Sequence, residues 1–167
     1  MTPYLNQETE MRPPTLLEAL LYPEKYREDL PTSQIVADPK VDINGVARYK
    51  AQLQVGKSLR PIVVVKHPHT ELYAVIDGHH RFFAQLESGQ PTIACAVIPD
   101  LTGLLYDLSK EGWLQPPPSV TKYLRKPILE LQNTLKQFIL NFQQNPTQLQ
   151  QIMQNWLKNQ HKSQRIN

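Results

Sequence analysis

The stretch from Tyr73 to Ala84 changes character halfway along, and this change constrains the fold most. Residues 73–76 are apolar and typical of a strand, and the chain then reads Asp77-Gly78-His79-His80-Arg81 before a pattern typical of a helix. A glycine at such a junction allows a tight turn. The sequence therefore predicts a strand, a turn and a helix, with polar residues gathered where the helix begins.

This turn has the composition of a phosphate site. Asp77 is able to cap the helix, and we expect the exposed amide of Gly78 and the next amides to face one anion at the positive end of the helix dipole. Arg81 is the strongest candidate for ligand contact, because a guanidinium matches a phosphate in geometry and charge. Its alternative role is a structural ion pair with Asp77.

The other polar residues of the turn also have more than one possible role. Asp77 is either a helix cap or a carboxylate that binds Mg²⁺ or accepts a proton from a substrate hydroxyl. His79 and His80 are candidate donors or proton carriers, and their side chains project about 100° apart on a helix, so both are not expected to bind one metal ion. A zinc site would need His67 and His69 as well, and we expect these two to lie on an exposed turn.

The flanking sequence predicts a small α+β domain. Strands are expected at residues 34–36, 61–66, 72–76 and 92–98, and helices at residues 44–53 and 79–88. Val46, Tyr49 and Leu53 have helical spacing in the first helix, and Phe82, Phe83 and Leu86 are expected to face the core in the second. The predicted core residues therefore lie on both sides of the turn.

Taken in order, these segments resemble the ParB/sulfiredoxin superfamily over about residues 30–99. The resemblance rests on Gly56-x-x-x-x-Pro61-Ile-Val-Val-Val, a short hairpin, a strand, Asp-Gly-His-His-Arg, a helix and Gly89. It implies a small mixed sheet with helices, and a nucleotide site in which Gly78 to Arg81 cradle the phosphates of ATP, ADP or CTP with Mg²⁺. In related nucleotide-binding members the loop before the strand lies near the ligand, which makes Lys57, Ser58 and Arg60 candidate contacts.

The residues of the turn distinguish the branches of this superfamily. Sulfiredoxins have a cysteine directly after the glycine, whereas this chain has His79, and its single cysteine, Cys95, falls in a predicted buried strand. Because the cysteine directly after the glycine is missing, a sulfinic-acid reductase is not expected. Chromosome-partition ParB proteins have a Gly-Glu-Arg-Arg type of turn that binds cytidine triphosphate, and only the arginine matches here.

The Asp-Gly-His-His-Arg turn is similar to that of archaeal free-serine kinases. In those enzymes the aspartate and a glutamate before the first helix serve phosphoryl transfer from a nucleotide. Asp77 matches the aspartate, while the place of the glutamate offers only Asp38 or Asp42. Either the shorter carboxylate serves the reaction or the activity is absent.

Composition agrees with one soluble domain and appendages. The 167 residues are 40% hydrophobic and 20% charged, and they contain one cysteine, which excludes an internal disulfide. No apolar run has the length of a membrane span, and the N-terminus has no signal-peptide pattern, so we expect a cytoplasmic protein that does not bind membranes.

The charge is uneven along the chain. Residues 1–120 contain 11 Lys/Arg and 14 Asp/Glu, which gives −3, whereas residues 121–167 contain 7 and 1, which gives +6. A basic terminal segment is able to bind DNA or an acidic partner, and its alternative role is a solvated helical surface.

Four parts are predicted along the chain. Residues 1–29 form an arm with a short helix, which begins at the capping-box spacing Thr15 to Glu18. Residues 30–115 form the ParB/sulfiredoxin-like domain, and residues 116–120 form a proline-rich linker. Residues 121–167 form a basic, glutamine-rich pair of amphipathic helices, a hairpin that either docks on the domain or pairs with a second copy as a homodimer.

Two functions follow from these expectations. The first is a nucleotide-binding protein that transfers phosphate from a nucleotide to a small hydroxyl compound such as free serine. The alternative is a DNA-associated regulator or partition-like protein, in which the domain is a nucleotide switch and the basic tail contacts DNA or a second copy. Whether the protein is an enzyme stays open on the sequence.

Overall fold

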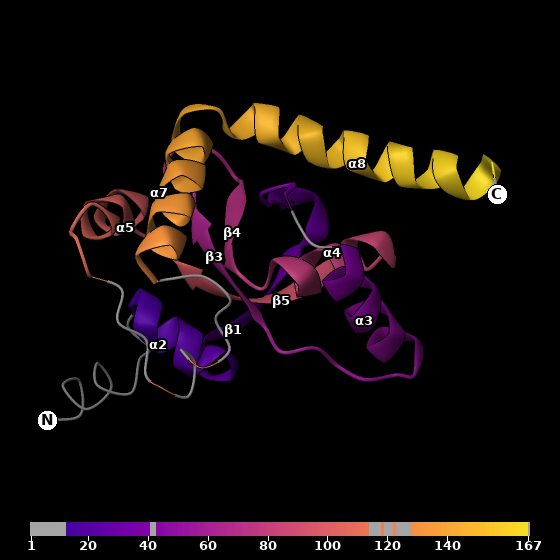
Figure 1. Ribbon diagram of the computed structural model, residues 1–167, viewed down its shortest axis with the longest axis horizontal. Helices are drawn as coiled ribbons and strands as arrows, with labels where there is room; N and C mark the ends of the chain where they lie inside the picture. The colour runs from indigo at the N-terminus through magenta and orange to yellow at the C-terminus, as the bar shows by residue number, and fades with distance from the viewer. Residues whose placement is uncertain (1–12, 41–42, 114–117, 119–121, 123–127, 167) are drawn as a thin grey trace, which may run out of the picture.

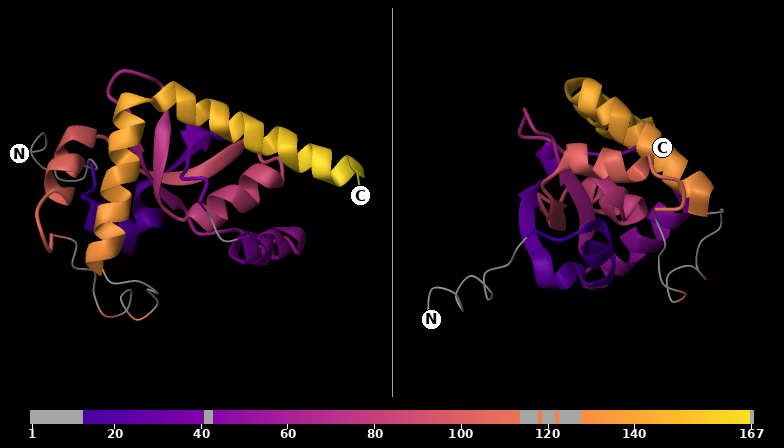
Figure 2. Two further views of the ribbon diagram at one scale, coloured as in Figure 1. Left: turned by 45° about the horizontal axis from the view of Figure 1, so that its top comes forward. Right: turned by 90° about the vertical axis from the view of Figure 1, so that its left-hand side faces the viewer.

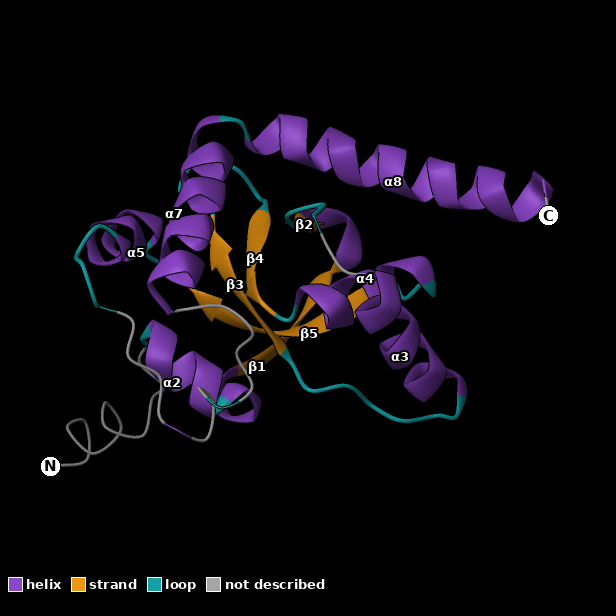
Figure 3. Cartoon of the chain, viewed as in Figure 1, coloured by secondary structure: helices purple, strands orange, loops and turns teal. Residues whose placement is uncertain are grey.

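Five strands form one mixed sheet at the centre of the structure (Figures 1 and 3). The computed structural model describes residues 13–40, 43–113, 118, 122 and 128–166. The strands are β1 (Arg27–Pro31), β2 (Ile35–Val36), β3 (Ile62–Lys66), β4 (Tyr73–Asp77) and β5 (Thr92–Ile98), in the order β1-β5-β3-β4-β2. The pairs β1–β5 and β3–β4 are antiparallel, while β3–β5 and β2–β4 are parallel. The predicted α+β class with a mixed sheet is confirmed.

Six α-helices surround this sheet in the described part of the chain. They are α2 (Leu16–Leu21), α3 (Ile43–Gln54), α4 (His79–Glu87), α5 (Leu101–Leu108), α7 (Ile128–Gln144) and α8 (Pro146–Ile166), with short 3₁₀ turns at Pro23–Tyr26 and Thr32–Gln34. The strands and helices that the sequence predicts between residues 34 and 98 are all present, and their ends differ by no more than about one residue, as expected for helix and strand ends.

The burial of β3 and α4 explains why the sequence predicts both elements. β3 lies between β5 and β4, and Ile62 to Val65 are buried on both faces, which requires a continuous apolar run. In α4, Phe82 and Phe83 are fully buried, and Leu86 is buried with them, as the helical spacing predicts. These helix residues fix α4 against the sheet directly after the turn that carries the polar residues.

The N-terminal segment is partly integrated into the domain. Thr15 and Glu18 make both hydrogen bonds of the predicted capping box, and Leu16 and Ala19 of α2 are buried in the core. The sheet itself begins at Arg27, within the predicted arm of residues 1–29, because β1 pairs with β5 from Arg27 opposite Ala96.

The two C-terminal helices pack on the domain. Phe138, Ile139 and Phe142 of α7, and Leu149 and Met153 of α8, are buried in the same core as the sheet. α7 contacts α5 and β4, and α8 contacts β2 and α4. Figures 1 and 2 show the helices meeting at a corner, from which α8 runs on past β2 and α4.

This docking places both apolar stripes against the domain. The predicted pair of helices is confirmed, and its helices contact one another beside the corner. In the part of the chain that the structure describes, no helix combines the length and the hydropathy that crossing a membrane requires. The predicted linker lies almost wholly outside the described residues.

Candidate functional site

The turn between β4 and α4 leaves the start of the helix uncapped. Gly78 is the N-cap residue of α4, and its φ of 96° lies in the left-handed region that glycine adopts without strain. Among the described residues, no side chain accepts a hydrogen bond from the first-turn amides of α4, although these amides lack acceptors within the helix. The predicted cap is therefore wrong: Asp77 does not cap α4, because its carboxylate pairs elsewhere.

That partner is Arg81, whose guanidinium forms the structural centre of the turn. Its Nη2 donates to Oδ2 of Asp77 at 2.9 Å, while Nη1 donates to the carbonyl oxygens of Arg60 at 3.0 Å and Pro61 at 3.1 Å. The Arg81 side chain is only 10% exposed, whereas that of Asp77 is 50% exposed. The guanidinium thus joins three segments, and the carboxylate of Asp77 stays accessible.

Gly78 is also required by the packing of this arginine. A Cβ atom at Gly78 would lie 2.7 Å from Nη2 of Arg81 and 2.7 Å from Cγ2 of Ile62, closer than real Cβ contacts. The turn therefore needs glycine for its backbone conformation and for the space that Arg81 occupies.

His79 is the most unusual polar residue of the turn. Its Nε2 is buried and has no hydrogen-bond partner among the described residues, and its ring lies edge-on to Phe138 of α7 with centroids 6.1 Å apart. Burial lowers the pKa of His79, and the nearby carboxylates of Asp38 and Asp77 oppose this effect. The imidazole therefore tends to stay neutral, with one ring nitrogen unsatisfied.

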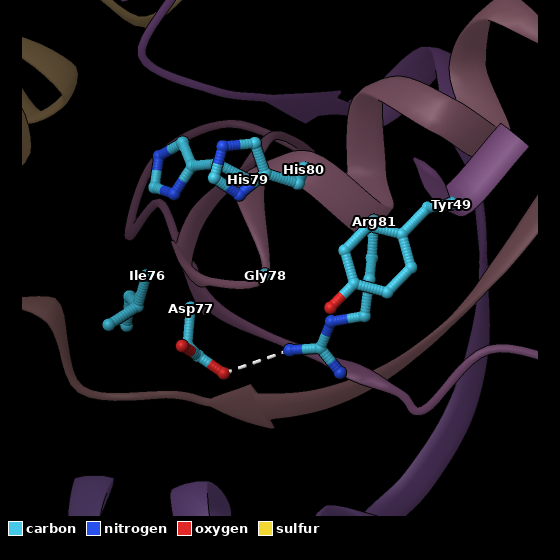
Figure 4. Close-up of a pocket in the computed structure, with 7 residues that line it drawn as sticks. All are labelled: Tyr49, Ile76, Asp77, Gly78, His79, His80 and Arg81. Carbon is cyan, nitrogen blue, oxygen red and sulfur yellow. Dashed lines mark hydrogen bonds and ion pairs between the residues drawn. The ribbon is translucent and has the colours of Figure 1, made fainter. Parts of the chain in front are cut away.

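These residues line a pocket of about 290 Å³ (Figure 4). Its walls are formed by seven residues, which come from the end of β4, the start of α4 and one position of α3: Tyr49, Ile76, Asp77, Gly78, His79, His80 and Arg81. Figure 4 shows Asp77 and Arg81 facing one another across the turn. The structure thus brings together all five predicted residues of the turn.

The pocket also includes a residue that the sequence does not single out for function. Tyr49 has the spacing of a core residue, and part of it does pack against the core. Its helix approaches the turn closely because Gly45 has no side chain: a Cβ there would lie 2.5 Å from Cδ2 of His80. In the sequence, a glycine one helical turn before a tyrosine does not predict this close packing, because the helix that packs against it is not known.

The predicted contacts from the loop before β3 do not line this pocket. Lys57 and Ser58 are exposed, and Arg60 is turned to the N-terminal segment, where its Nη2 donates to the carbonyl oxygen of Leu20 at 2.6 Å. The backbone carbonyl of Arg60, rather than its side chain, reaches the site through Arg81. Their contact with a ligand remains a prediction.

Of the two candidates for a second carboxylate, the structure describes Asp38 only. Asp38 follows β2 and lies close enough to His79 to act on its pKa, and it accepts a hydrogen bond from the amide of Lys40 at 3.0 Å. Asp42 lies outside the described residues. Asp38 is therefore the acidic residue that the structure places beside the turn in addition to Asp77.

The histidines of the β3–β4 hairpin have a structural role. His67 is only 4% exposed, contrary to the expectation of an exposed turn, because its ring lies beneath α7. Its Nε2 is 3.0 Å from the carbonyl oxygen of Gln143, and its Nδ1 accepts from the amide of His69. Within the described residues, no group of three or more His, Cys, Asp or Glu side chains is arranged to hold a metal ion.

The single cysteine of the chain lies in the core. Cys95 is fully buried in β5, as predicted, and burial raises the pKa of its thiol to about 12. A thiolate is the reactive form of cysteine, so a thiol with a raised pKa at this buried position is a poor nucleophile at neutral pH.

Over about half its length the chain is structurally similar to solved structures of ParB, sulfiredoxin and free serine kinase proteins. No family model and no curated protein matches the sequence. Similarity to the sulfiredoxin of Arabidopsis thaliana covers 44% of this chain and 85% of that one, with 26% identity and a TM-score of 0.37.

Two nucleotide complexes are among the structures that are similar to part of this chain. The chromosome-partitioning protein ParB from Caulobacter crescentus, complexed with CTP-γ-S, is 19% identical over 44% of each chain, with a TM-score of 0.39. A free serine kinase in complex with AMP is 17% identical over 52% of this chain and 43% of the kinase, with a TM-score of 0.40. The match spans less than half of the ParB chain and less than half of the kinase chain, so the similarity concerns the fold alone.

Proposed function

We propose that this protein binds the phosphate group of a nucleotide at the start of α4. The observation that carries the proposal is the uncapped first turn of α4, which opens on a pocket also lined by Asp77, His79 and Arg81. Amides without internal acceptors point along the helix axis toward the N-terminus, where the helix dipole also favours an anion.

Two further features support an anionic ligand. Gly78 has no side chain, so an anion is able to approach the backbone of the turn closely. Arg81 adds a permanent positive charge beside the amides, although its hydrogen bonds to Asp77, Arg60 and Pro61 give it a structural role as well. Of its two expected roles, the ion pair with Asp77 is the one present, and contact with a phosphate belongs to the proposal.

As its reaction we propose phosphoryl transfer from the nucleotide to a small hydroxyl compound, with free serine as the first acceptor to test. Asp77 is exposed enough to orient the acceptor hydroxyl and take its proton, and Asp38 is the carboxylate available for the second acidic role. One carboxylate also suits Mg²⁺, which takes further ligands from substrate phosphates and water, and which would neutralise charge on the transferred group.

The binding proposal is best tested on the backbone amides themselves. We would record ¹H–¹⁵N NMR spectra while adding AMP, ADP, ATP or CTP with Mg²⁺, and we expect the largest shifts at Gly78, His79 and His80. The start of α5 is an internal control, because Asp100 already caps it and accepts from the amide of Gly103 at 2.9 Å. No shift with any nucleotide, or shifts centred away from α4, would refute the proposal.

The reaction needs its own experiment. Incubation of the protein with ADP or ATP, Mg²⁺ and isotope-labelled serine should yield labelled phosphoserine, and Asp77→Asn should abolish the product while nucleotide binding remains. Arg81→Ala is a poorer probe, because it removes three structural hydrogen bonds at once. Binding without any product would leave a nucleotide-binding protein that is not a kinase for serine.

The DNA-associated alternative depends on the basic tail. Of its seven cations, the structure describes the side chains of Lys122, Lys136 and Lys158 only. No contact of these three favours DNA, and α7 and α8 use their apolar faces to pack on the domain. The nucleotide site is therefore the function that the geometry supports best.

A further inference from the structure

Among the described residues that line the pocket, Tyr49 is the one outside the β4–α4 segment. It lies on α3, is partly buried, and packs in part against the core. A tyrosine in such a position presents an apolar body to the core and a polar tip to the open side. The open side of Tyr49 is the pocket, as Figure 4 indicates.

The position of Tyr49 is fixed by the packing of α3 on α4. Gly45 precedes Tyr49 by four residues and so lies on the same face of α3. This face meets the first turn of α4 so closely that a Cβ at Gly45 would collide with the ring of His80. The close packing of α3 on α4 thus holds Tyr49 on the pocket that the first turn of α4 also lines.

The hydroxyl of Tyr49 makes no hydrogen bond to any residue that the structure describes, so in a residue that lines the pocket it is available to a ligand. We infer that the Tyr49 hydroxyl donates a hydrogen bond to an oxygen of the ligand's phosphate group. The inference rests on the proposed function, because the phosphate is placed by the amides of α4. It adds a contact from a second element, and the bond to a charged oxygen is of the stronger kind.

The test is removal of this one hydroxyl. Tyr49→Phe keeps the ring that packs on the core, and Tyr106→Phe is the matched control, since Tyr106 is 66% exposed on α5. Calorimetric titrations would measure the affinity for ADP with Mg²⁺ and, separately, for inorganic phosphate. We expect Tyr49→Phe to weaken both affinities by about 10-fold or more, and Tyr106→Phe to change neither.

Each other outcome has a defined meaning. Equal affinity of wild type and Tyr49→Phe would overturn the inference and leave the proposed function standing. Weaker binding of ADP with unchanged binding of phosphate would overturn it too, because the hydroxyl would then contact the nucleoside. If the wild type binds neither ligand, the proposed function and this inference both fail. The urea midpoint of Tyr49→Phe should match the wild type, which separates lost binding from lost structure.

Discussion

Gly78 determines both the shape of the turn and the space beside it. Replacing it with alanine forces a left-handed conformation that costs about 1–2 kcal/mol, and it also places a methyl group against Arg81 and Ile62. Gly89 is a matched control, because its φ is 74° but a Cβ there meets nothing within 4 Å. We expect Gly78→Ala to lower the free energy of unfolding by at least about 1 kcal/mol more than Gly89→Ala, as measured by urea denaturation. Equal losses would mean that Arg81 moves aside without cost.

The buried imidazole of His79 predicts a pH dependence of stability. Because burial lowers the pKa of His79 in the folded state, the unfolded chain, with a pKa near 6.5, takes up the proton first as the pH falls. The stability that neutral His79 contributes is therefore complete above about pH 7 and is lost progressively as the pH falls from about 6.5 toward the folded-state pKa.

The difference between two variants isolates this effect. His79→Gln should lose less stability than the wild type between about pH 7.5 and pH 5, by up to about 1.4 kcal/mol for each pH unit. His69→Gln, at an exposed position of the β3–β4 hairpin, is the control for the replacement of a histidine. Urea denaturation at a series of pH values measures both, and identical curves for wild type and His79→Gln would contradict the prediction.

At the scale of elements, the contact between α3 and α4 depends on one missing side chain. Gly45→Ala should destabilise the protein by about 1–3 kcal/mol, because the new methyl group overlaps the ring of His80. With His80→Ala already present, the same change should be neutral or stabilise by up to about 1 kcal/mol, since alanine favours a helix over glycine. Urea denaturation of the two single variants and the double variant gives the coupling energy. Additive effects would show that the two residues do not constrain one another.

Elements were predictable where their own residues carry the pattern. β3, β4 and α4 show apolar runs or spacing because they are buried by the sheet around them. β1 was not predicted, since Arg27, Glu28 and Asp29 are exposed on an edge strand, and its place depends on pairing with β5 almost 70 residues later. α5 was also missed, although Asp100 caps it, because Gly103 interrupts its short apolar sequence.

The site was predictable in composition but only partly in geometry. The five residues of the turn adjoin one another in sequence, so any fold with this strand and helix keeps them together. The partners of Arg81 include carbonyl groups about 20 residues earlier, and Tyr49 arrives on another helix, neither of which local sequence reveals. The cap was wrongly assigned to Asp77 for the same reason, since Arg81 holds its carboxylate.

At the scale of the whole molecule, the C-terminal helices belong to the core of the domain. Phe142 of α7 is fully buried and lies edge-on to His67, with ring centroids 5.2 Å apart, while His67 contacts the carbonyl oxygen of Gln143. At the far end, the indole of Trp156 on α8 donates to Glu87 of α4 at 2.7 Å. Because these contacts join α7 and α8 to the sheet and to α4, we expect the described parts to unfold together.

Phe142→Ala tests this cooperativity. The lost burial and the resulting cavity should lower the free energy of unfolding by about 3–5 kcal/mol, whereas Leu129→Ala, at a residue 46% exposed on the same helix, should change it by less than about 0.5 kcal/mol. Urea transitions followed by circular dichroism and by tryptophan fluorescence should coincide in the wild type and in both variants. If Phe142→Ala instead detached α7 and α8 while the rest kept its stability, the two helices would be a separate unit, and His79 at the pocket would lose its contact with Phe138.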